Sequence, residues 1–274
     1  MITIAADDHI DLQIHTVYSD GQWQPAALIA YLAHEAFRLV AITDHDTLEN
    51  VSELQALGAV HAVQVLPGVE MTTNWHGYSA HLLCYAAAFR DETLATLAQA
   101  TVATQLANTR DVYETLTRRG FRFPEESALP VRPIDNARLL LAHGYAATLD
   151  DALRMITDAG YRSISAPLGD VVEAAHASGA LAVLAHPGRG GGEIHRYYPP
   201  QIVEMLREIP LDGIETRYPT YSGEQVAVYT EFARERGLLA SAGSDSHGPE
   251  QRPPVPYPAA HCAELLERCG VDVV

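Results

Sequence analysis

The sequence contains little cysteine, no long apolar run and few basic residues, and each shortage excludes a class of protein. Its three cysteines, Cys84, Cys262 and Cys269, are too few and too scattered for a disulfide framework, and none forms a C-x-x-C pair. No apolar run reaches the ~18 residues that a membrane helix needs, and residues 1–9 lack the basic-then-apolar order of a secretory signal. We therefore expect a cytoplasmic protein that has reduced thiols and no membrane partner.

The shortage of basic residues bears on the partners of the protein. Lys and Arg together number 18 against 35 Asp and Glu, which gives a formal net charge of −17. Surfaces that bind nucleic acid broadly are basic and neutralise phosphates, so we expect no duplex DNA partner. A phosphorylated small molecule, a nucleotide or a short single-stranded RNA held at one site remains compatible with this charge. The oligomeric state is left open.

Length and periodicity indicate the fold class. At 274 residues and 47% hydrophobic content, one α/β barrel fits as well as two domains. Strand-like runs alternate with helical stretches, and apolar runs such as residues 181–185 favour parallel strands that are covered on both faces. The strand-like runs are 10–15, 39–43, 62–66, 81–85, 181–185, 213–216 and 238–242, and the helical stretches include 25–36, 48–57, 170–178 and 223–236. This pattern predicts a closed, seven-stranded (β/α) barrel with its site at the C-terminal rim of the strands.

Residues 91–165 interrupt this alternation. They contain a long helical stretch at 94–119 and two shorter ones near 137–143 and 149–159. We expect residues 1–90 and 166–274 to form the barrel. We expect residues 91–165 to form a helical insertion that covers the mouth of the active site.

Histidines and acids recur at the ends of the predicted strands. Alone, each has a common explanation as a helix cap or a hydrogen-bonded half-buried residue. Together they supply five histidines and three acids: His15, His45, His81, His186 and His247, with Asp20, Glu70 and Asp245. Imidazole and carboxylate ligands without thiolate favour manganese, iron or zinc over magnesium alone. Two such ions ~3.5–4 Å apart activate water and stabilise phosphoryl transfer, so the pattern predicts metal-assisted hydrolysis.

The order and spacing of these segments resemble the PHP (polymerase and histidinol phosphatase) family of metal-dependent phosphoesterases. The matching segments are Asp11-Leu-Gln-Ile-His15, Thr43-Asp-His45, Pro67-Gly-Val-Glu70, His81, Ala185-His-Pro187 and Gly243-Ser-Asp-Ser-His247. The resemblance implies a distorted seven-stranded (β/α) barrel. It also implies a centre of two or three divalent ions, in three ligand sets: Gln13, His15, Glu70 and Asp245; Glu70, His81 and His186; Asp20, His45 and His247. The helical insertion and Arg132-Pro133 resemble the branch of nucleoside 3′,5′-bisphosphate phosphatases and 5′-to-3′ exonucleases of short RNA.

The resemblance also implies roles for individual residues. Glu70, Asp245 and His186 are expected to carry catalysis. Arg132 and Arg189 are expected to bind phosphate, because a guanidinium can hold two phosphate oxygens at once. Tyr218 is expected either to stack on a base or to pack inside the protein.

Two positions depart from the family pattern. Gln13 stands where the family has histidine, and an amide oxygen is a poorer ligand for manganese or zinc. We therefore hypothesise that the first ion binds weakly, or that the centre works with two ions. Residues 132–138 also differ, which affects the leaving-group side of the pocket. A non-catalytic or weakly active regulatory module that binds metal is the alternative, and amide hydrolysis is a less supported third function.

Overall fold

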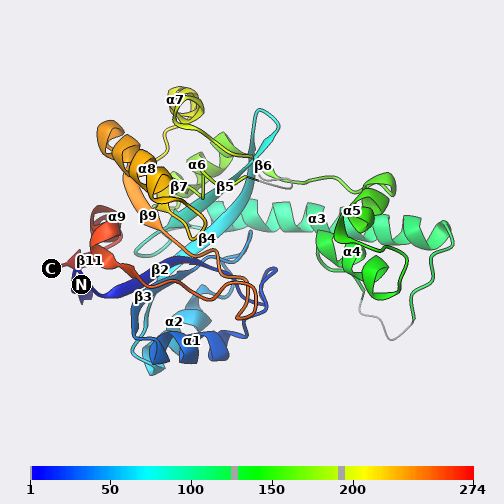
Figure 1. Cartoon of the computed structure of the whole chain (residues 1–274), viewed down its shortest axis with the longest axis horizontal. Helices are drawn as coiled ribbons and strands as arrows, with labels where there is room; N and C mark the ends of the chain where they lie inside the picture. The colour runs from blue at the N-terminus through cyan, green and yellow to red at the C-terminus, as the bar shows by residue number, and fades with distance from the viewer. Residues whose placement is uncertain (1, 125–128, 191–194) are drawn as a thin grey trace. The chain divides into compact units, whose positions relative to one another are not determined.

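A computed structural model describes residues 2–124, 129–190 and 195–274, and it contains the predicted barrel (Figure 1). The seven wall strands are β2 (His9–Ile14), β3 (Phe37–Ile42), β4 (Gln64–Trp75), β5 (Tyr78–Tyr85), β7 (Leu181–Leu184), β8 (Gly213–Arg217) and β9 (Leu239–Ala242). They pair in that order, and the short strand β10 (Tyr257–Pro258) pairs with β2 at the edge. The predicted α/β fold and seven-stranded barrel are confirmed.

The barrel closes through the segment that follows β9. The amide of His15 donates to the carbonyl of Ser246 at 2.8 Å, and the amide of Asp245 donates to the carbonyl of Gln13 at 2.9 Å. These bonds join the end of the first wall strand to the chain beyond the last one. Predicted ligand residues from both ends of the sequence therefore lie at the closure.

The prediction of an all-parallel sheet is wrong for β5. This strand runs antiparallel to both β4 and β7. Strands β4 and β5 form one hairpin, whose two-residue turn His76-Gly77 has positive φ angles of 51° and 83°. Such a turn fits the twist of paired strands. Because β5 is reversed, His81 lies in its first half and still reaches the rim.

Helices cover the outside of the barrel wall. The structure has α1 (Pro25–His34), α2 (Val51–Val60), α6 (Leu168–Ala177), α7 (Pro199–Glu208), α8 (Gly223–Arg236) and α9 (Ala263–Arg268), and Figure 1 shows α1 and α2 beside β2 and β3. Helix α8 begins at a capping box in which Ser222 and Gln225 bond reciprocally, and it ends at Gly237 with φ 65°. Helices α7 and α9 lie outside the predicted ranges.

Apolar side chains fill the barrel on both faces of its wall. Leu12, Leu83 and Tyr85 belong to the inner core, and the Tyr85 hydroxyl donates to the carbonyl of Leu12 at 2.7 Å. The outer cores lie between the wall and its helices. Two short pairs complete the sheets: β1 (Ile2–Ile4) with β11 (Val271–Val273), and β6 (Ala166–Pro167) with β4.

The chain divides into two compact units, residues 1–98 with 165–274 and residues 99–164. The second unit contains most of α3 (Thr93–Arg118), with α4 (Pro133–Ala142) and α5 (Leu149–Asp158). Its small core includes Val112, Leu116, Leu140 and Ile156. The expectation that this insertion covers the mouth of the barrel stays a prediction.

The shortages in the sequence have structural counterparts. Cys84, Cys262 and Cys269 are buried and form no disulfide. Among the described residues, no helix is both long enough and apolar enough to cross a membrane. The cytoplasmic location stays a prediction.

We predict that Gly213→Ala destabilises the barrel. A Cβ atom at Gly213 would overlap the carbonyl oxygen of Leu239 on the neighbouring strand β9. Overpacking of this kind costs about 1–3 kcal/mol. Gly223→Ala is the matched control, because no atom lies within 4 Å of a Cβ added there, and its effect is expected to stay within about 0.5 kcal/mol. Urea unfolding measures both, and equal stabilities for the two variants would contradict the close approach.

Candidate metal centre

The structure brings all nine predicted ligand residues to one rim of the barrel. They come from the end of β2, the loops after β2, β3, β7 and β9, and the hairpin β4–β5. They are Gln13, His15, Asp20, His45, Glu70, His81, His186, Asp245 and His247. Residues separated by more than two hundred positions in the sequence are thus neighbours, and their service as ligands stays a prediction.

Glu70 lies in the middle of this group and is fully buried. Its Oε1 atom is 2.8 Å from His81 Nδ1 and 3.2 Å from His186 Nε2. Its Oε2 atom is 2.8 Å from His15 Nε2 and 2.8 Å from Gln13 Nε2. Both carboxylate oxygens therefore face nitrogen atoms, which is the placement that a bridging ligand requires.

The local charges keep the acids of the cluster ionised. Burial would raise the pKa of Glu70, but His45, whose ring is charged only at acidic pH, and the hydrogen bonds with the imidazoles of His186 and His81 hold it well below its usual range. Burial also opposes ionisation of Asp20 and Asp245, and nearby histidines again lower the pKa of both carboxyls. The rim therefore offers negative charge to a cation.

The histidines of the cluster differ in their protonation. Burial lowers the pKa of His45 to about 4, so its ring is neutral at pH 7. Burial also favours the neutral form of His15, but the nearby carboxylates of Asp245 and Glu70 outweigh it and raise the pKa of that ring well above its usual value. A bound cation replaces a proton on such rings, because ligand imidazoles must be neutral.

Several buried polar atoms of the cluster lack a hydrogen-bond partner. Among the described residues, no hydrogen-bond partner is found for either ring nitrogen of His15, for Nδ1 of His45 or for Oε1 of Gln13. His15 Nε2 does lie 2.8 Å from Glu70 Oε2, although this contact lacks hydrogen-bond geometry. An unsatisfied buried polar atom costs about 1–3 kcal/mol. Nitrogen and oxygen atoms that face one another without bonding fit a shared divalent cation.

Three groups of side chains place their ligand atoms within 4.8 Å of one another. They are His15, Asp20, His45 and His247; His45, Glu70 and His81; and His15, Glu70 and Asp245. Each differs by one side chain from a predicted set. His15 joins the group of Asp20, His45 and His247, and His45 takes the place of His186 beside Glu70 and His81. The group of His15, Glu70 and Asp245 is the first predicted set without the amide of Gln13.

Gln13 is oriented as a hydrogen-bond donor toward the centre of the cluster. Its side-chain nitrogen donates to Glu70 Oε2 at 2.8 Å, while its side-chain oxygen is one of the unpartnered buried atoms. An amide nitrogen cannot bind a cation. In this orientation the first ion would rest on His15, Glu70 and Asp245 alone.

Buried acids beside the cluster hold its loops in place. Asp11 accepts bonds from the amides of Ser244 and Val255, and burial raises its pKa to about 7. Asp44 accepts bonds from the amide and hydroxyl of Thr16 and from the Ser19 hydroxyl, which fixes the loop that carries Asp20. Asp46 accepts from the Thr72 amide at 2.8 Å. Sequence analysis assigned no role to Asp11.

Of the three predicted substrate-binding residues, two lie at the cluster. Arg189 Nη1 is 2.5 Å from Asp245 Oδ2, and the hydroxyl of Tyr218 donates to the same oxygen at 2.8 Å. Tyr218 is only 3% exposed, which favours packing over base stacking. Arg132 lies in the second unit, at the start of α4, where it pairs with Asp135. The substrate roles of all three stay predictions.

Sequence reasoning missed one arginine of the site. Arg252 donates to the Tyr218 hydroxyl and to the carbonyl of Ser244, and it lies 3.6 Å from Asp245 Oδ2. The one signal in the sequence was its position five residues after His247.

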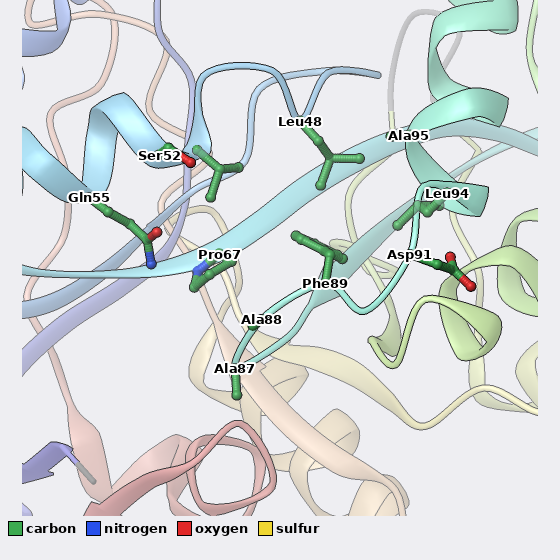
Figure 2. A pocket seen from close by; sticks show the side chains of 11 residues that line it. Leu48, Ser52, Gln55, Pro67, Ala87, Ala88, Phe89, Asp91, Leu94 and Ala95 are labelled. Atoms are coloured by element: carbon green, nitrogen blue, oxygen red, sulfur yellow. The ribbon is translucent and has the colours of Figure 1, made fainter.

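A separate cavity of about 300 Å³ lies elsewhere in the first unit (Figure 2). Figure 2 shows mainly apolar side chains around it, among them Leu48, Pro67, Phe89 and Leu94. It shares no residue with the cluster, and its lining offers one carboxylate, Asp91, which bonds to Ser178. This cavity has none of the features of the metal centre.

The chain is similar to several known proteins and solved structures. No model of a known protein family matches the chain. The 3′,5′-nucleoside bisphosphate phosphatase of Chromobacterium violaceum is 28% identical over 254 residues, which cover 88% of each chain. The 5′-3′ exoribonuclease Rnm of Salmonella typhimurium is 31% identical over 258 residues, which cover 87% of this chain and 85% of that protein. A solved structure from Bifidobacterium adolescentis, classed as a metal-dependent phosphoesterase, shares the fold with a TM-score of 0.79 at 24% identity, over 95% of this chain and 96% of that one.

We predict that Glu70→Gln lowers manganese affinity at least about 100-fold, equivalent to ~2.7 kcal/mol, because it removes the carboxylate that faces both sides of the cluster. Glu215→Gln is the matched control. Glu215 is also fully buried, but burial raises its pKa well above the usual range and its Oε2 accepts only the His186 amide. Calorimetric titration with Mn²⁺ measures both variants, and similar losses would show that Glu70 has no special role.

We predict that Gln13→His raises manganese affinity about tenfold, or ~1.4 kcal/mol, because an imidazole supplies the nitrogen ligand that the amide lacks. Gln24→His is the control, since this exposed residue precedes α1 and is not among the nine predicted ligands. Metal analysis after dialysis gives the number of ions. Three tightly held ions in the unaltered protein would refute a weak first ion.

Proposed function

The chain belongs to the PHP family of metal-dependent phosphoesterases, and from this premise we propose the reaction that its site performs. It is a hydrolase. The proposed substrate is a phosphomonoester or phosphodiester of a small nucleotide, such as a nucleoside 3′,5′-bisphosphate, or a short 5′-phosphorylated RNA. The activities of the two curated relatives support both substrates.

One observation carries the proposal: buried imidazoles and carboxylates converge around Glu70, with an arginine at their edge. A guanidinium beside such a centre can bind two phosphate oxygens at once. Here Arg189 lies 2.5 Å from Asp245, and its side chain is 32% exposed. A substrate phosphate at the rim would therefore meet both the centre and a fixed positive charge.

The chain's own residues have three tasks in this mechanism. Glu70, with histidines on either side, would hold the cations, together with Asp245 and His186 at the same rim. Divalent ions at such a site supply activation of water and stabilisation of charge on phosphoryl oxygens. Arg189 binds a phosphoryl oxygen and orients the ester for in-line attack. No residue is assigned to protonate the leaving oxygen.

We further propose that two or three ions bind, with manganese, iron or zinc favoured over magnesium by the imidazole content. The donor orientation of Gln13 toward Glu70 supports a first site of low affinity. The sites that retain their histidines, around His81 and around His247, would then hold the tighter ions.

The regulatory alternative makes a different prediction for the same protein. A module that only binds metal would hold ions without turning over any phosphate ester. Gln13 is the one substituted position among the nine predicted ligands, and the eight that remain support catalysis over this alternative.

We predict that manganese-loaded protein releases phosphate or nucleotides from at least one member of a defined panel. The panel contains nucleoside monophosphates, 3′,5′-bisphosphates, histidinol phosphate and short 5′-phosphorylated RNA. Chelation of the metal is expected to abolish release, and Glu70→Gln to lower it at least about 100-fold. The absence of turnover on every member, with metal shown to be bound, would reject the proposed hydrolysis in favour of the regulatory alternative.

A further inference from the structure

The Oδ2 atom of Asp245 accepts two hydrogen bonds and lies near a third donor. Oδ2 of Asp245 receives the Tyr218 hydroxyl at 2.8 Å and Arg189 Nη1 at 2.5 Å, and Arg252 Nη1 lies 3.6 Å away. The other oxygen, Oδ1, faces His15 and His247 at 3.3 and 3.4 Å. Asp245 therefore turns one oxygen toward the predicted ions and the other toward two arginines.

The two arginines differ in how firmly they are held. The Arg252 guanidinium donates to the Tyr218 hydroxyl at 2.6 Å and to the Ser244 carbonyl at 2.9 Å. Its backbone is also fixed, because its amide donates to Gly248 and its carbonyl accepts from the Ser246 hydroxyl. Arg252 is thus part of the loop that presents Asp245.

Arg189 has a single hydrogen bond from its guanidinium among the described residues, the one to Asp245. Its guanidinium also lies 5.8 Å from the centroid of the Tyr218 ring. A guanidinium carries five N–H donors, so most of those on Arg189 are available to another anion. The side chain is 32% exposed, which allows a substrate to reach it.

We propose that the two arginines act in sequence on one carboxylate, with Arg189 binding substrate and Arg252 serving as a positioning residue. Arg189 leaves Asp245 and binds the phosphoryl oxygens of the substrate. The Tyr218 hydroxyl, which accepts from Arg252, then keeps Asp245 Oδ2 bonded, and the Arg252 charge remains 3.6 Å away, so that Oδ1 stays directed at His15 and His247. The inference rests on the proposed function for the identity of the anion, a phosphate monoester or diester.

The charges at this position agree with such an exchange. Asp245 contributes one negative charge and the two guanidinium groups contribute two positive charges, so the trio has a net charge of +1. An incoming phosphate neutralises this excess, while the remaining Arg252–Asp245 pair stays balanced. The chain contains no lysine, so no flexible ammonium group competes for the anion.

The test is a double-mutant cycle on phosphate binding by manganese-loaded protein. Inorganic phosphate is titrated calorimetrically into the unaltered protein, Arg189→Met, Arg252→Met and the double variant. We expect Arg189→Met to weaken phosphate binding about 10- to 100-fold. Arg252→Met alone is expected to weaken it about 5- to 10-fold, because Asp245 then retains Arg189. In the Arg189→Met background the second substitution is expected to change the affinity less than about twofold.

Two results would overturn the inference. If the fold-losses of phosphate affinity multiply in the double variant, both arginines contact phosphate directly. If Arg252→Met leaves the phosphate affinity unchanged, Arg252 does not position Asp245. Arg234→Met is the control for lost positive charge, since Arg234 lies on α8 and pairs with Glu231, and its phosphate affinity should not change. If Arg252→Met does not fold, Arg252→Lys enters the same cycle with the same criterion. Phosphate binding is measured without turnover. If the two substitutions are coupled as expected but the protein hydrolyses no substrate, the proposed function is rejected and the roles of the two arginines stand.

Discussion

The site depends on a carboxylate buried among imidazoles. Glu70 has no exposed surface, and its two oxygens face nitrogen atoms of four side chains: Gln13, His15, His81 and His186. A buried carboxylate is stable only where opposite charge or strong donors surround it. The rim satisfies that requirement by bringing together side chains from β2, the β4–β5 hairpin and the loop after β7. Cation binding and local stability are therefore properties of the same contacts.

The hydrogen bonds that close the barrel also bring the residues of the centre together. The bonds from His15 to Ser246 and from Asp245 to Gln13 join the end of β2 to the chain beyond β9, and three of these residues are predicted ligands. Asp11 strengthens the same junction by accepting the amides of Ser244 and Val255. A change that loosens the closure would therefore also disperse the ligands.

The sequence allowed the strands and the ligands to be predicted, but only part of their arrangement. Apolar runs bounded by polar residues identify buried strands such as β7, and histidines and acids after them identify the rim. A run of apolar residues does not show whether a strand runs parallel or antiparallel to its neighbour. The antiparallel direction of β5 follows from the tight turn at His76-Gly77. Arg252 and Asp11 act through contacts with residues far away in the sequence, and no local pattern marks such contacts. The position of residues 99–164 over the barrel stays a prediction for the same reason.

Three residues of the rim adopt left-handed backbone conformations that are unfavourable for side chains other than glycine: Asp46 at φ 51°, His186 at φ 28° and Asp245 at φ 54°. Their neighbours in the fold must supply the free energy that keeps them there. Glycine at His186 or Asp245 would relieve this backbone strain but would remove a predicted ligand. The strained backbone at these two positions is therefore the cost of presenting their side chains to the centre.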